Sequence, residues 1–317
     1  MPFAAVFPGQ GSQSVGMMGG WGERQALVEA TFAEASRALE GALGEFDLWA
    51  LACDGPESEI NRTEITQPLM LTAGVAAWRV WQAVGGATPL CMAGHSLGEY
   101  TALVCAGAME FSDAVRVVAE RGRLMQQAVP LGAGAMAAVL GLDDAVVMAV
   151  CAEAQGDEIV EAVNFNSPGQ VVIAGSAAAV ARATLLLQDK GAKRVLPLPV
   201  SVPSHSSLMR DAAMQMAKVL EDVEIRRPQI PVVHNVDAAE HVEPDALRAA
   251  LVSQLYRPVL WVDSVRAMQA RGAQAVLEFG PGKVLAGLSK RIDKALAAYP
   301  VLDEVSLAQA MQVLKVG

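Results

Sequence analysis

The sequence predicts an α/β protein whose main domain is built on a parallel sheet and carries a smaller inserted domain. Short apolar runs bounded by Gly and Pro predict buried strands, helix-period segments separate those runs, and the rhythm of the elements changes between about residues 130 and 200. The chain has 317 residues, more than one compact core usually takes. A large domain with an insertion fits both the pattern and the length.

The main sheet is predicted from four apolar runs. They are "FAAVF" at 3–7, "PLCMA" at 89–93, "IPVVHN" at 230–235 and "AVLEF" at 275–279. The first run ends at Pro8 and Gly9, as expected for a buried strand followed by a turn. Because buried strands that alternate with helices are typical of parallel sheets covered on both faces, we predict a parallel α/β sheet.

The inserted domain is predicted from a different order of elements. A strand at 135–142 is followed by a helix at 143–156, strands at 158–165 and 170–175, a helix at 176–191 and a strand at 194–198. Asp143 and Ser176 suit the starts of the two helices, and Gly156 and Gly191 suit their ends. The order β-α-β-β-α-β is that of a ferredoxin-like unit.

Composition limits the classes of protein that fit. Apolar residues make up 53% of the chain and the mean hydropathy is +0.32, which predicts a globular protein. The formal net charge is −10 and no basic run is present, so nucleic acid is not expected as a partner. The N-terminus lacks the basic start of a signal peptide, and the apolar segment 68–81 contains Arg79 and is too short to span a bilayer. These observations predict a cytoplasmic protein with no membrane contact.

The cysteines predict neither a disulfide framework nor a zinc site. Cys53, Cys91, Cys105 and Cys151 lie in apolar surroundings, and no two of them form a Cys-x-x-Cys pair. We therefore expect reduced, buried thiols and no metal ion.

A G-x-S-x-G motif stands between a predicted strand and a predicted helix. Its members are Gly94, Ser96 and Gly98. A serine on a tight strand-to-helix turn needs small neighbours, because a Cβ two residues away would meet crowded backbone. The turn would present the Ser96 hydroxyl at the carboxyl edge of the sheet, where the dipole of the next helix favours a developing oxyanion. Ser96 is thus a candidate nucleophile, the alternative being an ordinary glycine-rich turn.

A serine nucleophile needs a base, and the chain has four histidines. His95 adjoins Ser96, so its side chain is expected to point elsewhere. His234 is expected to pack or to form a local hydrogen bond, and His241 lies in a polar surface segment. His205 follows the inserted segment and precedes a predicted helix, where a loop could hold it over a cleft between domains. We predict His205 as the base.

Arg121 is a basic residue on the apolar face of a predicted helix, where it could reach a binding site. In the predicted helix 111–128, with Ser112 as its expected N-cap, Val118, Arg121 and Met125 share an apolar face. The neighbouring arginines lie on a charged face. A lone arginine on an apolar face is either a structural ion pair or a fixed cation for a carboxylate substrate.

Eight motifs along the chain carry a family resemblance. They are "FPGQGSQ" at 7–13, "TQP" at 66–68, "GHSLGEY" at 94–100, "RGRLMQ" at 121–126, "NFNSPGQVVIAG" at 164–175, "VPSHSSLM" at 202–209, "QLYRPVLW" at 254–261 and "EFGPGKVL" at 278–285. With these motifs in this order, the chain resembles the malonyl-CoA:acyl carrier protein transacylases of bacterial fatty acid synthesis. The resemblance implies an α/β-hydrolase-like domain at 1–128 and 201–317 with a ferredoxin-like insertion at 129–200.

The resemblance also implies roles for individual residues. Ser96 would be the nucleophile and His205 its base, with Gln254 orienting the histidine in place of a triad carboxylate. The main-chain N–H groups of Gln10 and Leu97 would form the oxyanion hole, and Arg121 would bind the malonyl carboxylate. The polar residues expected near the cleft are Gln67, Asn164 and Asn166. For the last three residues, a helix start and a hairpin turn are alternative readings.

The implied reaction is a ping-pong transfer. Ser96 would take the malonyl group from malonyl-CoA and pass it to the phosphopantetheine thiol of holo-acyl carrier protein, and no cofactor would be required. The carrier protein of this pathway is acidic, so docking needs local basic residues. The candidates are Lys193, Arg194, Lys283, Lys290 and Arg291. We expect the enzyme to be a monomer.

Two other classes of protein share part of this pattern. A serine esterase or thioesterase would use the same Ser-His chemistry, but Arg121 and the lack of a clear Asp in the order Ser, Asp, His argue against it. A non-catalytic module that binds carrier protein is disfavoured because both Ser96 and His205 are present.

Overall fold

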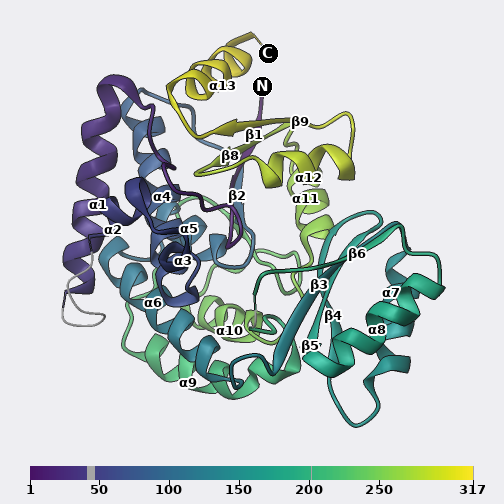
Figure 1. The fold of residues 1–317 in the computed structure, drawn as a ribbon. Helices are drawn as coiled ribbons and strands as arrows, with labels where there is room; N and C mark the ends of the chain where they lie inside the picture. The colour runs from purple at the N-terminus through teal and green to yellow at the C-terminus, as the bar shows by residue number, and fades with distance from the viewer. Residues whose placement is uncertain (41–46, 201, 317) are drawn as a thin grey trace.

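Two β-sheets organise the chain in the computed structural model, which describes residues 1–40, 47–200 and 202–316 (Figure 1). The larger sheet has five strands in the order β7-β2-β1-β8-β9, and all its neighbouring strands are parallel. Their bounds are β1 Phe3–Phe7, β2 Cys91–Gly94, β7 Val232–Val233, β8 Ala275–Phe279 and β9 Ala297–Val301. The predicted parallel α/β sheet is confirmed.

The strand predictions differ in accuracy. Those for β1 and β8 match residue for residue, whereas the run at 230–235 forms only the two-residue strand β7. Strand β9 was not predicted. It contains Pro300 and is only partly buried, and an edge strand tolerates both features while losing the continuous apolar signature of a central strand.

Helices cover both faces of the larger sheet, as the alternating side chains of β1 show. Phe3, Ala5 and Phe7 pack in the core shared with α1, α4, α5, α6 and α9, whereas Ala4 and Val6 pack with α11 and α12. The helices of this domain are α1 Gln25–Leu39, α2 Leu48–Asp54, α3 Glu57–Ile60, α4 Thr63–Ala83, α5 Gly98–Cys105, α6 Phe111–Gln127, α9 Arg210–Glu221, α10 Pro244–Gln254, α11 Trp261–Ala270, α12 Val284–Ile292 and α13 Glu304–Val316.

Two of these helices bear on the sequence predictions. The apolar segment 68–81 lies in α4, which is buried over most of its length. Among the residues described, no helix has the length and apolar character needed to cross a membrane.

Helix α6 begins at Phe111 with Glu110 as its N-cap, so the prediction of Ser112 as N-cap is wrong. Ser112 is the second residue of the helix, two positions after the N-cap.

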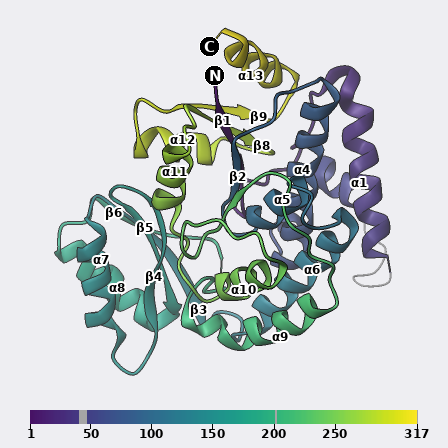
Figure 2. The same cartoon turned by 180° about the vertical axis from the view of Figure 1, so that it is seen from behind.

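The second sheet lies beside the first and is antiparallel, with the order β4-β5-β3-β6. Its elements are β3 Gly134–Leu140, α7 Asp144–Gln155, β4 Val160–Ser167, β5 Gln170–Ser176, α8 Ala177–Asp189 and β6 Arg194–Pro197. The β-α-β-β-α-β order is the predicted one, and Asp143 and Ser176 are the N-caps of α7 and α8. Helices α7 and α8 cover the outer face, and the inner face is turned toward the larger domain (Figures 1 and 2).

The second sheet is joined to the larger domain by main-chain hydrogen bonds. The Phe165 N–H donates to the Val259 carbonyl at 3.0 Å, and the Val259 N–H donates to the Val163 carbonyl at 2.9 Å. These bonds tie β4 to the segment before α11. The inner face of the second sheet is therefore held over the carboxyl ends of β1 and β2.

Candidate active site

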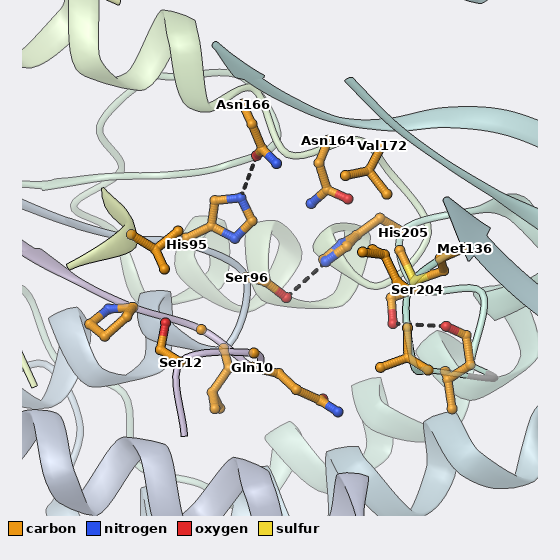
Figure 3. A pocket seen from close by; sticks show the side chains of 18 of the residues that line it. Gln10, Ser12, His95, Ser96, Met136, Asn164, Asn166, Val172, Ser204 and His205 are labelled. Carbon is orange, nitrogen blue, oxygen red and sulfur yellow. Dashed lines mark hydrogen bonds between the residues drawn. The ribbon is translucent and has the colours of Figure 1, made fainter. Parts of the chain in front are cut away.

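A cavity of about 350 Å³ lies between the two sheets (Figure 3). Its floor is the loop after β1 and the turn between β2 and α5, and its opposite wall is the inner face of the second sheet. Helices α6 and α12 close two sides with Arg121, Met125 and Leu288. Clefts at the carboxyl ends of parallel strands are the usual ligand sites of α/β sheets.

The serine of the G-x-S-x-G motif sits on a strained turn at this floor. Ser96 has a φ of 52°, which is a left-handed conformation that a side chain rarely adopts. A Cβ on Gly94 would lie 1.8 Å from the Gly98 carbonyl carbon, and one on Gly98 would lie 2.1 Å from the Phe7 carbonyl oxygen. The two glycines are required by close backbone contact, as the motif predicts.

Ser96 and His205 are hydrogen-bonded to each other, although 109 residues separate them. The distance from Ser96 Oγ to His205 Nε2 is 2.8 Å, and His205 Nδ1 lies 2.7 Å from the Gln254 carbonyl oxygen. A carbonyl can only accept, so Nδ1 carries the proton and Nε2 is free to accept the serine proton. Burial and the nearby Arg121 lower the pKa of His205 to about 3, so the ring is neutral near pH 7.

Gln254 acts on the histidine differently from the prediction. It is the main-chain carbonyl, not the side-chain amide, that holds His205. The amide Nε2 donates to the Ser96 carbonyl at 3.0 Å, and Oε1 accepts from Arg121 Nη2 at 2.9 Å. The side chain of Gln254 therefore links the Ser96 backbone to Arg121.

Arg121 is 1% exposed, and every side chain to which it donates is neutral. Nη1 donates to Gln67 Oε1 at 2.8 Å, and Nη2 lies 3.3 Å from Ser96 Oγ. Its Nε has no hydrogen-bond partner among the residues that the structure describes, and its guanidinium carbon lies 5.5 Å from the centre of the Tyr100 ring. A buried cation that lacks a bonded carboxylate favours an anionic ligand at that place.

The two residues predicted to bind an oxyanion line the same cavity as Ser96. Gln10 follows β1 and Leu97 follows Ser96, and both line the cavity. Within the ranges that the structure describes, neither main-chain N–H donates to another protein group. The Gln10 side chain points to Thr63 Oγ1, at 3.4 Å.

The other predicted polar residues divide into two groups. Gln67 lies on α4 and contacts the arginine rather than open space, donating also to Met125 Sδ at 3.6 Å. Asn164 and Asn166 lie on β4 and line the cavity (Figure 3). Asn166 Oδ1 lies 2.8 Å from His95 Nε2, so His95 points away from the Ser96 hydroxyl, as expected, and toward the insertion.

The remaining histidines lie away from the reacting pair. His234 is fully buried, which agrees with the packing alternative, and its Nδ1 donates to Glu99 Oε1 at 2.9 Å, a partner 135 residues away and not a local one. His241 is partly buried and bonds to Asp237. Among the described residues, no group of three or more His, Cys, Asp or Glu side chains is arranged to hold a metal ion.

The five basic docking candidates are all exposed. Lys193 and Arg291 line the same shallow cavity, although one belongs to the insertion and the other to α12. Arg291 Nη1 donates to Gln170 Oε1 at 2.6 Å, and Lys290 Nζ lies 5.8 Å from the Tyr299 ring. Arg194 lies on β6, and Lys283 is the N-cap of α12.

Sequence reasoning missed Asn235, which contacts the nucleophile's backbone. Its Oδ1 accepts from the Ser96 N–H at 2.7 Å. The available signal was its position at the end of the apolar run 230–235, two residues after β7, because the carboxyl ends of parallel strands meet at one edge of the sheet.

Comparison with known proteins identifies the family of the chain. The model of the acyl transferase domain family matches residues 5–306. A malonyl CoA-acyl carrier protein transacylase of Escherichia coli strain K12 is 54% identical and is aligned over 98% of this chain and 99% of its own length. A crystal structure of an acyl carrier protein S-malonyltransferase from Vibrio cholerae has a TM-score of 0.94 at 53% identity, covering 98% of this chain and 100% of its own.

A further solved structure, a type II PKS acyl-carrier protein in complex with its malonyl-transacylase, has a TM-score of 0.96 at 52% identity and covers 99% of this chain and 100% of that one. The chain therefore belongs to the acyl transferase domain family and, within it, to the malonyl CoA-acyl carrier protein transacylases.

Proposed function

We propose that this protein transfers the malonyl group of malonyl-CoA to the phosphopantetheine thiol of holo-acyl carrier protein, through an ester on Ser96, and so supplies fatty acid biosynthesis. The observation that carries the proposal is the pairing of a Ser-His couple with a buried arginine. Arg121 lies 3.3 Å from the Ser96 hydroxyl and donates to neutral side chains. A malonyl ester on Ser96 has a carboxylate two carbons from the ester carbonyl carbon, within reach of that guanidinium.

Acylation begins with attack by Ser96 Oγ on the thioester carbonyl carbon. His205 Nε2, at 2.8 Å, takes the hydroxyl proton as the C–O bond forms. The Gln254 carbonyl on Nδ1 stabilises the imidazolium that results, in place of a carboxylate. When the C–S bond breaks, His205 returns the proton to the departing CoA sulfur.

The tetrahedral intermediate carries a negative oxygen. The N–H groups of Gln10 and Leu97 are the donors proposed for it, and Leu97 stands at the start of α5, where the helix dipole also favours negative charge. In the second half of the reaction, the carrier thiol gives its proton to His205 and attacks the ester carbonyl carbon, and His205 returns the proton to Ser96 Oγ as the ester C–O bond breaks. No metal or redox group takes part in these steps.

Docking of the carrier protein is proposed at the junction of the two sheets. Lys193 and Arg291 face one shallow cavity, and Lys290 is the exposed neighbour of Arg291. Opposite charge on the carrier would speed encounter at this surface although the whole chain carries a net charge of −10. We propose that the enzyme acts as a monomer in the cytoplasm, where reducing conditions would keep its four free cysteines as thiols.

Intact-mass spectrometry tests the proposal and separates it from hydrolysis. The protein is mixed in turn with malonyl-CoA and acetyl-CoA, and holo-acyl carrier protein is then added. A transferase accumulates a malonyl adduct that persists until the carrier removes it. Continuous release of free malonate without a carrier would indicate a thioesterase, and the absence of any adduct would indicate a binding module.

A further inference from the structure

Besides Gln254, a second buried side chain, that of Asn235, binds the backbone around the proposed nucleophile without taking a direct part in the proposed reaction. Ser96 adopts a left-handed φ of 52°, which L-residues avoid unless the surroundings hold them. The preceding strand and the following helix leave no space there, as the contacts of Gly94 and Gly98 show. Something must therefore satisfy the polar backbone groups that the turn takes out of regular structure.

Asn235 supplies both partners. Its Oδ1 accepts from the Ser96 N–H at 2.7 Å, and its Nδ2 donates to the Gly94 carbonyl, also at 2.7 Å. The residue is fully buried, so neither bond competes with solvent. A single amide thus bridges the turn from two residues before the nucleophile to the nucleophile itself.

Asn235 is in turn fixed by the helix that follows the serine. Its main-chain N–H donates to Glu99 Oε2 at 2.8 Å, and its carbonyl accepts from the Leu260 N–H at 2.9 Å. The other oxygen of Glu99 accepts from His234, and Glu99 and His234 are both fully buried. The contacts form a closed loop from Ser96 through Asn235 to Glu99, three residues further along the chain.

We propose that Asn235 is a positioning residue for the transfer reaction, which acts by holding the Ser96 backbone in its strained conformation. Because the Ser96 N–H is bound to Asn235, it is not available to an oxyanion, and the Leu97 N–H, which donates to no protein group that the structure describes, is left for that role. The same contact keeps Ser96 Oγ at 2.8 Å from His205 Nε2. Asn235 does not line the cavity, so it contributes to the rate of acylation rather than to the binding of the thioester.

The inference rests on Ser96 as the proposed nucleophile, and the experiment separates the two claims. Acylation by malonyl-CoA is followed by rapid quench and intact mass for wild type, Ser96→Ala, Asn235→Ala and Asn235→Asp. An adduct on Ser96→Ala would overturn the nucleophile. No adduct on Ser96→Ala together with a wild-type rate for Asn235→Ala would overturn only the positioning role.

The expected result is a loss of rate without a loss of binding. Asn235→Ala should acylate at least ~10-fold more slowly, with the KM for malonyl-CoA within about twofold of wild type, since small displacements of a nucleophile are costly. Asn235→Asp keeps an acceptor for the Ser96 N–H but replaces the donor to Gly94 with a carboxyl oxygen that meets the Gly94 carbonyl, so it should also acylate more slowly than wild type. Thr72→Ala, which removes a buried hydrogen bond to the Pro68 carbonyl in α4 away from the cavity, is the control for general loss of stability.

Amide hydrogen exchange gives a readout that does not depend on the variants being active. In the wild-type protein, the Ser96 amide should exchange slowly and the Leu97 amide at least ~10-fold faster, because only the first has a buried partner. If Asn235→Ala does not fold, this measurement still decides the matter. Equal and fast exchange of both amides, or an Asn235→Ala rate that falls no more than that of Thr72→Ala, would contradict the proposal.

Discussion

The two walls of the cavity differ in chemistry. The wall from the larger domain carries Ser96, His205 and Arg121, which are linked by hydrogen bonds to one another or to Gln254. The facing wall, from the second sheet, is mainly apolar, with Met136 and Val172 beside two asparagines (Figure 3). One wall holds the reacting and charged groups in place, and the other covers them.

The difference between the two walls indicates what each contributes to the site. Electrostatic interactions strengthen when water is excluded, so an apolar wall opposite Arg121 and His205 increases their effect on a bound acyl group. The low pKa of His205 has the same origin, since burial is its largest cause. Substitutions on the polar wall should therefore change chemistry, whereas changes at the rim of the junction should change encounter with the carrier.

The largest effect on the polar wall is expected from His205. His205→Ala should slow acylation by ~10²–10⁴-fold, because the serine then has no base within hydrogen-bond distance. Rapid-quench measurement of adduct formation checks the value. His241→Ala, which removes a partly buried histidine that bonds to Asp237 outside the cavity, should acylate at the wild-type rate. Similar losses of rate in the two variants would mean that His205 is not the specific base.

A smaller and selective effect is expected from Arg121. Arg121→Ala should lower kcat/KM for malonyl-CoA by ~10–100-fold, the value of a charge-assisted contact with a carboxylate, and should leave acetyl-CoA unchanged or improved. Arg121→Lys should restore part of the loss, because an ammonium cannot make the planar two-bond contact. Equal losses for both thioesters, together with a lower Tm, would mean that Arg121 supports the fold and that the carboxylate is bound elsewhere.

Removing the positive charges of Lys290 and Arg291 should slow only the reaction with the carrier protein. Lys290→Gln combined with Arg291→Gln should lower kcat/KM for holo-acyl carrier protein by ~2–10-fold at low salt, with the loss shrinking as salt screens the charges. Acylation by malonyl-CoA should not change. Lys218→Gln, an exposed charge on α9, is the matched control. Carrier kinetics that match the control at every salt concentration would show a solvated helix face and no docking surface.

The smallest effect is expected from pH. Burial lowers the folded-state pKa of His205 from 6.5 to about 3, so the ring stays neutral and able to accept a proton as the pH falls through 6.5. The acylation rate of the folded enzyme should vary by less than about twofold between pH 8 and about pH 5. The same pKa shift makes the folded protein less stable in acid. As the pH falls below 6.5, His205 binds a proton in the unfolded chain but not in the folded one, so the free energy of unfolding declines. An acid limb with a midpoint near 6.5 in acylation would contradict the environment described for His205.

The local parts of this picture could be predicted from the sequence. The strand-turn-helix around Ser96 and the apolar face that holds Arg121 are short-range patterns, and the structure contains both. The N-cap of α6 was misplaced because Ser112 and Glu110 are both plausible at a helix start, and only the extended backbone of Glu110 decides between them.

Long-range contacts were beyond such patterns. Ser96 meets His205 and Asn235 across 109 and 139 residues, and no periodicity reports that kind of separation. The family resemblance supplied the histidine but not Asn235. It named Gln254 without showing that a main-chain carbonyl, available from any residue type, makes the contact with His205.

The central claim is that the malonyl group is carried by Ser96 on the polar wall. The most direct measurement is peptide mapping of the wild-type enzyme after brief exposure to malonyl-CoA, with and without a chase of holo-acyl carrier protein. The account predicts one malonyl group, on Ser96 in the peptide that joins β2 to α5, and its disappearance on the chase with malonyl-carrier formed in equal amount. A malonyl group on any other side chain, or one on Ser96 that the carrier cannot remove, would contradict it.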